Sequence, residues 1–467
     1  MHGIELAGTA LAAGGLVAAV AASGHALLHK RRPQSAFGWI ALCFTLPLAG
    51  AALYYLFGIN RVKTRARKLL TRHPVEVCPT EHVGVPPAGL EPLGRLGHSI
   101  THLPLTTGNE VDLLHNGDQT FPAMLAAIRA ATQRVFLSTY IFDTGPLGRE
   151  FIAALADAAG RGVDVRVLLD GIGELYSLPR AGTLLHRRGV RVARFLPPRL
   201  WPPLFSVNLR NHRKILAVDG WIGFTGGTNI RESGLGTDDH RLVDLHARVA
   251  GPVVAQIEAV FLRDWQFVTG ESTTAAPPAQ AKLPGTAECR AIADGPERSY
   301  DRLTELLVGA IGSARRRIAI MTPYFLPPRE IIAPLQAAAL EGVDVAVILP
   351  ERNNLPYVHR ATRHMLWELL ERGVRIYYQP GVFAHSKLFY IDDDYAQIGS
   401  ANLDPRSLRL NFEMNVEIYD PAFVAQLSAH FEAVRARSAR VTVQQVDGRP
   451  LRTKFVDGAA WLFSPYL

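Results

Sequence analysis

The chain has 467 residues, of which 48% are hydrophobic and 20% are charged, so it can form a packed core and is not expected to be disordered. That length is enough for two or three domains. The formal net charge of +8 favours an anionic partner, either a phospholipid surface or nucleic acid, without choosing between them. Three cysteines at unrelated spacings argue against a disulfide framework and against a cysteine-ligated zinc site: Cys43, Cys78 and Cys289.

Two long apolar runs lie near the start of the chain, at residues 4–28 and 35–60. The first contains a single charged residue, Glu5, and the second contains none. Each run is long enough to cross a bilayer as a helix, which takes about 20 apolar residues. We therefore predict two transmembrane helices within residues 1–60. The alternatives are a cleaved signal peptide, or one span followed by a re-entrant segment.

Basic residues on both sides of the second apolar run predict how the chain is oriented in the membrane. The connector before this run carries Lys30, Arg31 and Arg32. The segment after it carries a larger set, namely Arg61, Lys63, Arg65, Arg67, Lys68 and Arg72. Because Lys and Arg are enriched in cytoplasmic loops, we predict that the main body is cytoplasmic and that the connector lies outside. Residues 61–108 then form a basic juxtamembrane linker, which would also attract anionic lipid headgroups.

The rest of the chain reads as two similar halves, residues 109–271 and 285–446, with a Thr-, Ala- and Pro-rich linker at 272–284 and a tail at 447–467. Short apolar segments that are typical of buried strands recur in the same order: 133–142 and 317–325, then 162–170 and 342–350, then 188–194 and 372–378. Helical, Ala- and Leu-rich stretches precede them. Alternating helices and strands predict an α/β fold, and the recurrence predicts an internal duplication.

One motif occurs once in each half and carries the residues suited to chemistry. It reads His212, Lys214, Asp219 and Asn229 in the first half and, at the same spacing, His385, Lys387, Asp392 and Asn402 in the second. Residues two apart on a strand share a face, so each His should lie beside its Lys. If the halves face each other, two imidazoles, two ammonium groups and two amides converge. Such a site suits a phosphate, because one His can attack phosphorus while the other protonates the leaving oxygen.

A single His-x-Lys segment is better explained as a half-buried strand with a solvated Lys. Its recurrence, each time followed by a small-residue turn that ends in Asn, favours the functional interpretation. Two carboxylates are candidates for orienting the imidazoles: Glu413 for one of them, and Asp244 as its counterpart in the first half. They could instead be surface or edge-strand carboxylates. Asp219 and Asp392 belong to the catalytic motif, but we interpret them as turn or structural residues rather than as direct reactants.

The paired motifs resemble those of the phospholipase D superfamily. More narrowly, the chain is similar along nearly its whole length to the bacterial cardiolipin synthase family, through residues 31–39, 56–61, 211–215, 323–325, 399–407 and 461–467. The resemblance implies a two-lobed fold with a mixed sheet in each lobe and a site at the lobe interface. It also implies a reaction that needs no metal and no cofactor.

The same resemblance implies a phosphatidyl transfer in a bacterial inner membrane. One phosphatidylglycerol would form a phosphatidyl-histidine and release glycerol, and the hydroxyl of a second would attack to give cardiolipin. His212 maps to the usual nucleophile of the superfamily, and His385 would be the general acid and then the base. Lys214, Lys387, Asn229 and Asn402 would bind the phosphate. The partners would be anionic phospholipids, namely phosphatidylglycerol and cardiolipin, and the oligomeric state stays open.

Other functions remain possible at this point. The same site could hydrolyse phospholipids with water as the acceptor, because acceptor choice depends on pocket shape and water exclusion. A nuclease of the superfamily is disfavoured by the two apolar runs and by the lack of a dense Lys/Arg tract in the catalytic part. A non-catalytic scaffold is disfavoured because both motifs are intact. Residues 196–205 form either an aromatic lip that meets acyl chains or a packed surface loop.

Overall fold

A computed structural model describes residues 2–30, 33–59, 77, 80–198, 209–236, 242–273, 275–277, 283–295 and 301–464. Most of the predicted lip at 196–205 lies outside these residues, as do parts of the basic linker and of the inter-lobe linker. The chain forms two compact units. One consists of Met1–Arg65 with Pro198–Phe205, and the other of Ala66–Pro197 with Ser206–Leu467.

The N-terminal unit is helical throughout its described residues. It contains α1 (His2–His29), α2 (Pro33–Thr45), α3 (Pro47–Leu53) and a π-helical turn, η1 (Tyr54–Gly58). Within α1, Gly8–His29 is long and apolar enough to cross a membrane. The second apolar run does not form one continuous helix, so the prediction of a second spanning helix is not confirmed.

The helix break in the second run lies at Leu46, whose φ of −130° and ψ of 74° are not helical. It directly precedes Pro47, and the residue before a proline is disfavoured in the helical region. After the break the chain folds back, since a Cβ at Gly50 would overlap the carbonyl oxygen of Leu42. The second run is therefore a helical hairpin.

The second unit begins with α5 (Glu91–Thr101), and its strands and helices then occur as two matching series. The first comprises β1 (Thr106–His115), α6 (Asn116–Ala130), β2 (Arg134–Thr139), α7 (Pro146–Gly160), β3 (Asp164–Asp170), η2 (Gly173–Tyr176), α8 (Ala181–Arg187), β4 (Arg191–Phe195), β5 (Ile215–Val218), β6 (Ile222–Gly226), η3 (Glu232–Gly234), β7 (Leu245–Ala250) and α9 (Val253–Thr269).

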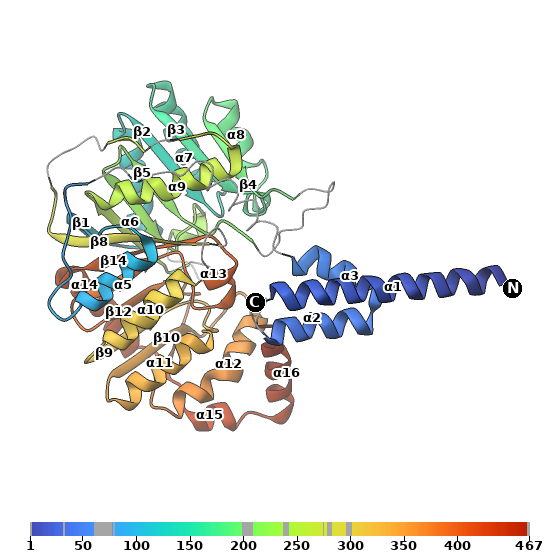
Figure 1. The fold of residues 1–467 in the computed structure, drawn as a ribbon. Helices are drawn as coiled ribbons and strands as arrows, with labels where there is room; N and C mark the ends of the chain where they lie inside the picture. Colours follow the sequence, from blue (N-terminus) through green and yellow to red (C-terminus); the bar gives the residue numbers. More distant parts are fainter. Residues whose placement is uncertain are drawn as a thin grey trace. The chain divides into compact units, whose positions relative to one another are not determined.

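The second series comprises β8 (Ala287–Asp294), α10 (Arg302–Ser313), β9 (Arg317–Met321), α11 (Arg329–Leu340), β10 (Asp344–Pro350), α12 (Pro356–Leu370), β11 (Arg375–Gln379), β12 (Leu388–Ile391), β13 (Tyr395–Gly399), α13 (Pro405–Arg409), β14 (Glu413–Tyr419) and α14 (Pro421–Ala436). The tail adds β15 (Ala439–Arg440), α15 (Val443–Asp447) and α16 (Leu451–Leu462). The predicted inter-lobe linker falls between α9 and β8 (Figure 1).

All these strands join one sheet, in the order β15-β11-β10-β9-β12-β13-β14-β8-β1-β7-β6-β5-β2-β3-β4. The neighbours β2-β3-β4 and β9-β10-β11 are parallel, and the other pairs are antiparallel. The α/β class with a mixed sheet is therefore confirmed. The two halves meet edge to edge where β1 pairs with β8, so the sheet runs continuously from one half into the other.

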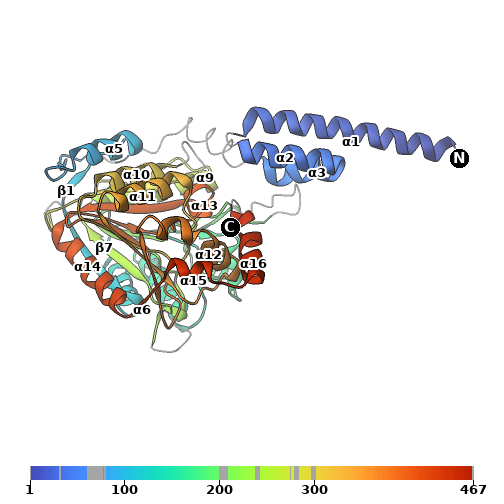
Figure 2. The same cartoon turned by 90° about the horizontal axis from the view of Figure 1, so that it is seen from below.

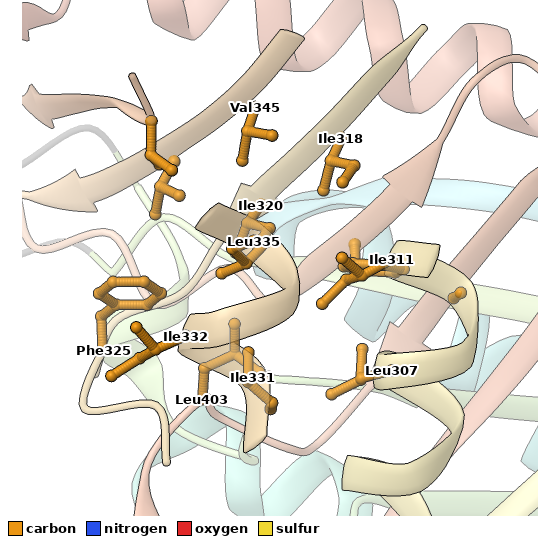
Figure 3. Packing of buried hydrophobic residues seen from close by; sticks show 14 of the residues in the cluster. Leu307, Ile311, Ile318, Ile320, Phe325, Ile331, Ile332, Leu335, Val345 and Leu403 are labelled. Atoms are coloured by element: carbon orange, nitrogen blue, oxygen red, sulfur yellow. The ribbon is translucent and has the colours of Figure 1, made fainter. Parts of the chain in front are cut away.

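Helices cover both faces of the sheet, as the alternation of side chains on its strands shows. In β2, Val135 and Leu137 are buried in the core that α6 and α7 form. Between them, Phe136 points the other way and stacks on Phe261 of α9, with ring centroids 5.0 Å apart. In the second half, α10 and α11 pack their aliphatic side chains against β9 and β10 (Figure 3). These two cores fix the strand ends that carry the motif residues.

Candidate active site

Each motif histidine lies in an extended segment directly before a buried strand, β5 or β12, rather than on the strand itself. The backbone N–H of His212 donates to the carbonyl of Phe412, at 2.9 Å, in the other half of the chain. In the same way, the N–H of His385 donates to the carbonyl of Val243 at 2.7 Å. Each histidine segment is thus tied to the approach to β14 or β7 of the opposite half, which brings both motifs to the junction of the halves.

The two imidazoles are paired with carboxylates that also come from the opposite half. Nδ1 of His212 lies 3.0 Å from Oε1 of Glu413. Nδ1 of His385 lies 2.9 Å from Oδ2 of Asp244. A carboxylate at Nδ1 keeps the proton there and leaves the lone pair on Nε2. The structure therefore brings together the predicted histidines and the predicted orienting carboxylates, in a crossed arrangement.

The surroundings of the two carboxylates differ. Glu413 is fully buried and accepts hydrogen bonds from the Ser400 hydroxyl at 2.5 Å and from the Asn411 amide at 3.2 Å. Asp244 accepts from the backbone N–H of Leu245 at 2.8 Å. Gly227 stands at the position that corresponds to Ser400, and a Cβ there would overlap both carboxylate oxygens of Asp244. The duplicated halves have therefore diverged at the groups that support the imidazoles.

The two motif lysines lie beside their histidines, as the spacing predicts. The ammonium groups of Lys214 and Lys387 each donate to the carbonyl of the histidine two residues earlier, at 2.7 Å. Both side chains are buried. Burial lowers the pKa of Lys214 to about 7, against the opposing effect of Glu413. Burial likewise lowers the pKa of Lys387 to about 8, against the effect of Asp244.

Burial also lowers the pKa of both imidazoles, to about 4 in each case. For His212 the negative charge of Glu413 opposes this shift, and for His385 the charge of Lys387 adds to it. Both rings are therefore neutral at pH 7. The Nζ atom of Lys387 lies 3.1 Å from Nε2 of His385, so that ring is already in contact with its motif lysine. The side chains of His212 and His385 remain 13% and 12% exposed, so the site is open to solvent. A nucleophile, two cations and an entrance are thus present together.

The two predicted phosphate-binding asparagines occupy different local settings. The Oδ1 atom of Asn229 accepts from the backbone N–H of Ile141 at 3.1 Å, which fixes the orientation of its amide. The Nδ2 atom of Asn402 donates to the hydroxyl of Ser407 at 3.1 Å. Its Oδ1 atom is buried and has no hydrogen-bond partner in the described part of the chain. Their role in binding phosphate stays a prediction.

Asp219 and Asp392, which the motif groups with the catalytic residues, lie away from the imidazoles. Asp219 stands in the turn after β5 with a φ of 53° and accepts from the backbone N–H groups of Thr132, Gln133 and Arg134. Asp392 does the same after β12, for Arg315, Arg316 and Arg317. A strand of four residues, about 13 Å long, separates each from its motif lysine. Their place among the catalytic residues stays a prediction, and the geometry fits the interpretation of both as turn residues.

Four residues of the site were not singled out from the sequence. The ring of Tyr140 lies edge-on to His212, with centroids 5.5 Å apart, and that of Tyr324 lies edge-on to His385 at 6.3 Å. The recurrence of tyrosine at matching strand ends could have found them. Ser400 and Asn411, which support Glu413, had no such signal, because the first half does not repeat their contacts. Within the described residues, no group of three or more His, Cys, Asp or Glu side chains is arranged to hold a metal ion.

This sheet and this pair of His-x-Lys motifs define a phospholipase D-like protein. The sequence profile of the PLD-like domain of cardiolipin synthase matches residues 124–265 and 307–435, and that of the phospholipase D-nuclease N-terminal family matches residues 17–58. The fold is similar to the crystal structure of phosphatidylserine synthase from Haemophilus influenzae Rd KW20, with a TM-score of 0.63, 16% identity, and coverage of 80% of this chain and all of that one.

The chain is also similar to curated proteins over nearly its full length. It is 32% identical over 457 residues to the cardiolipin synthase of Geobacillus kaustophilus, which covers 94% of this chain and 90% of that protein. It is 35% identical over 448 residues to cardiolipin synthase A of Pseudomonas entomophila, with coverage of 92% and 91%. The chain therefore belongs to the cardiolipin synthase family of phospholipase D-like proteins.

Proposed function

We propose that this protein is a cardiolipin synthase, a phosphatidyltransferase that converts two molecules of phosphatidylglycerol into cardiolipin and glycerol. The observation that carries the proposal is the crossed pairing of His212 with Glu413 and of His385 with Asp244, each beside a buried lysine. Two neutral imidazoles with oriented tautomers supply a nucleophile and a proton carrier. Two ammonium groups supply the charge that a phosphodiester needs.

In the first half-reaction, Nε2 of His212 attacks the phosphorus of one phosphatidylglycerol, and the bond from phosphorus to the glycerol headgroup oxygen breaks. His385, protonated as the anionic substrate enters, gives its proton to that oxygen, and glycerol leaves. Lys214 and Lys387 stabilise the negative charge on the nonbridging oxygens. The product is a phosphatidyl group joined to His212 through a P–N bond.

In the second half-reaction, neutral His385 takes the proton from a headgroup hydroxyl of a second phosphatidylglycerol. The hydroxyl oxygen attacks phosphorus, the P–N bond breaks, and cardiolipin forms with His212 restored. His212 is assigned as the nucleophile because its carboxylate partner is the more firmly held, by Ser400 and Asn411. A fixed carboxylate holds the ring in one orientation for in-line attack.

Two measurements on the purified full-length protein test this proposal. Incubation with phosphatidylglycerol should give cardiolipin and glycerol in equal amounts. Phosphatidic acid in place of cardiolipin would make the protein a hydrolase and overturn the synthase proposal. Rapid quenching with phosphorus-labelled substrate and peptide mapping should then place the label on His212, whereas a label on His385 would reverse the assigned roles.

We also propose that α1 crosses the bacterial inner membrane and that the catalytic body is cytoplasmic. A multi-pass arrangement requires the second apolar run to cross as one helix, and the break at Leu46 argues against that crossing. Contacts along the hairpin support re-entry instead. The ammonium of Lys30 donates to the carbonyl of Gly58 at 2.6 Å, and the Tyr54 hydroxyl lies 2.8 Å from Nδ1 of His25.

Both ends of the hairpin therefore lie beside the C-terminal end of α1, and its tip at Pro47 packs on Gly15. The 13 residues of α2 rise about 20 Å, which is short of the roughly 30 Å of the hydrocarbon layer. In this arrangement the basic connector and the basic juxtamembrane linker share the cytoplasmic face. Both basic segments then obey the positive-inside rule. Two spanning helices would instead place the two segments on opposite faces of the membrane.

Cysteine labelling in intact cells tests the re-entrant arrangement. In a cysteine-free background, Gln34→Cys at the start of α2, next to the basic connector, and Glu341→Cys on the catalytic body should react with a membrane-impermeant maleimide after permeabilisation and not before. Gly3→Cys, at the start of α1, should react in intact cells. Labelling of Gln34→Cys from outside would restore the two-span arrangement, and labelling of Glu341→Cys from outside would overturn the cytoplasmic location.

A further inference from the structure

The last helix of the chain, α16, is held against the body by a buried ion-pair network, together with Ala460, which packs on the core, and Trp461, whose ring lies 5.3 Å from that of His364. Asp457, near its middle, is fully buried and forms ion pairs with Arg363 of α12, at 2.7 Å, and with Arg449. Arg449 also donates to the backbone carbonyl of Arg363 at 3.1 Å. These contacts fix α16 against α12, beside which it lies in both views of the molecule (Figures 1 and 2).

The outward side of α16 is apolar. Leu451 is 84% exposed and Phe455 is 79% exposed, and Ala459 and Leu462 continue the same stripe at helical spacing. Val456 and Phe463 widen it. A helix on the surface of a soluble protein normally turns its apolar stripe toward the core. In α16 the longest apolar stripe faces outward instead, and the buried ion pairs of Asp457 fix that orientation, so the body does not use this surface for its own packing.

We propose that the outward face of α16 is a membrane-docking surface, which inserts into the interfacial layer of the bilayer that holds the substrate. The choice of a lipid bilayer as the occupant rests on the proposed function, since that substrate is a membrane lipid. It also rests on the side chains. Arg452 lies on the outward face among the apolar side chains, and Lys454 lies at the edge of the stripe, so both charges would meet anionic headgroups. Leu and Phe with flanking cations are typical of helices that lie in a membrane interface.

The position of α16 relative to the site agrees with this role. The helix on which it is mounted, α12, begins two residues after Asn354. The side-chain oxygen of Asn354 accepts from the Tyr324 hydroxyl at 2.8 Å, and the Tyr324 ring lies edge-on to His385. Docking of α16 therefore anchors, through α12, the elements that border His385.

The first half also presents apolar side chains near the site. Tyr176 and Leu178 are exposed, and the Tyr176 ring lies 6.4 Å from that of Tyr140, which contacts His212. The exposed Tyr176 thus lies against the tyrosine that borders the imidazole of His212. With Tyr176 and Leu178 turned toward the bilayer, the lipid headgroup would enter the site while the acyl chains stay in the apolar layer.

Depth-dependent fluorescence quenching tests the docking directly. The full-length protein, free of native cysteines, is labelled with an environment-sensitive dye at Phe455→Cys and reconstituted in phosphatidylglycerol vesicles. The dye should shift to the blue and be quenched by lipids that carry a nitroxide near the headgroup. A label at Glu341→Cys, on the exposed end of α11, is the control and should not respond. Absence of quenching at 455, or a blue shift that depends on protein concentration instead of on lipid, would overturn the proposal.

Activity gives a second, independent readout. The double variant Phe455→Ser with Leu462→Ser changes two outward side chains and leaves the buried contacts of Asp457 intact. Turnover of phosphatidylglycerol in vesicles should fall about tenfold, while turnover in detergent micelles should stay unchanged. Leu340→Ser, which alters an exposed leucine on α11, should leave both unchanged. Equal rates for the double variant and the native protein in vesicles would contradict the docking role. Failure of the proposed activity itself would abolish turnover in both systems and leave the quenching result standing.

Discussion

Glu413, in the second half of the chain, lies 3.0 Å from the Nδ1 atom of His212, which is 201 residues earlier in the first half. Asp244 of the first half has the same relationship to His385 of the second. Each half thus supplies one imidazole and the carboxylate that orients the other one. Neither half contains a complete pair, so the duplication produced one site from two interdependent halves.

Replacing Glu413 tests this interdependence. In Glu413→Gln, the amide can donate to Nδ1 of His212, which would move the ring proton to Nε2 and remove the nucleophilic lone pair. We expect kcat to fall by a factor on the order of 10² to 10⁴, with little change in KM. Ser400→Ala removes one hydrogen bond to the same carboxylate and should cost about tenfold. A Glu413→Gln variant with native kcat would show that Glu413 does not orient the nucleophile.

The pair formed by Asp244 and His385 depends on the absence of a side chain at residue 227. In Gly227→Ala, the added Cβ would overlap the carboxylate oxygens of Asp244 and displace them from His385. We expect kcat to fall by a factor on the order of 10², because small displacements in an active site have effects of that size. Gly160→Ala, at a position where a Cβ would meet nothing within 4 Å, is the matched control. Native activity of Gly227→Ala would contradict the proposed role of Asp244.

The buried lysines predict a loss of activity at alkaline pH. Burial lowers the pKa of Lys214 to about 7 and that of Lys387 to about 8, so the free enzyme loses these positive charges as the pH rises through those values. Because the site uses both charges, we expect kcat/KM for phosphatidylglycerol to fall about tenfold per pH unit between about pH 7 and 8 and about a hundredfold per unit at higher pH. Lys214→Arg, which stays charged, should shift the fall to higher pH. A profile that is flat up to about pH 9 would show that neither lysine governs binding of the phosphate.

The local patterns were readable from the sequence, because they depend on neighbouring residues. The spacing of His212 and Lys214, the strands that follow them and the recurrence in the second half predicted the fold class and the reactive groups. The crossing of the carboxylates was not predictable, since it depends on how two segments 201 residues apart meet through the sheet.

The second apolar run and α16 show the same limit. The composition of residues 35–60 predicts burial in an apolar phase, but the turn at Pro47 that makes a hairpin of it depends on packing against α1. In α16, the apolar stripe is visible in the sequence, but the direction that it faces is set by the ion pairs of Asp457 with distant arginines. In both cases nearby residues specify the helix, but its orientation depends on contacts with residues far away in the sequence.

The turn residue Asp219 supplies the sharpest test of which motif residues take part in the chemistry. Burial would raise its pKa, but backbone N–H groups at the start of β2 donate to its carboxylate and hold the pKa below its usual value. In Asp219→Asn, the side chain still tolerates the positive φ, but the charge-assisted hydrogen bonds are lost. We expect a destabilisation of about 1–3 kcal/mol and native kcat per folded molecule, measured by thermal unfolding in detergent and by turnover.

The pH dependence of that destabilisation follows from the direction of the shift. A carboxyl whose pKa is lowered on folding contributes stability above its unfolded pKa of about 3.9 and loses it as the pH falls further. The difference in unfolding temperature between the native protein and Asp219→Asn should therefore be constant near neutral pH and shrink below about pH 4. Asp392→Asn in the second half should also destabilise the protein at neutral pH, because Asp392 accepts from three backbone N–H groups in the same way. A large loss of kcat at unchanged stability would instead place Asp219 among the reacting groups.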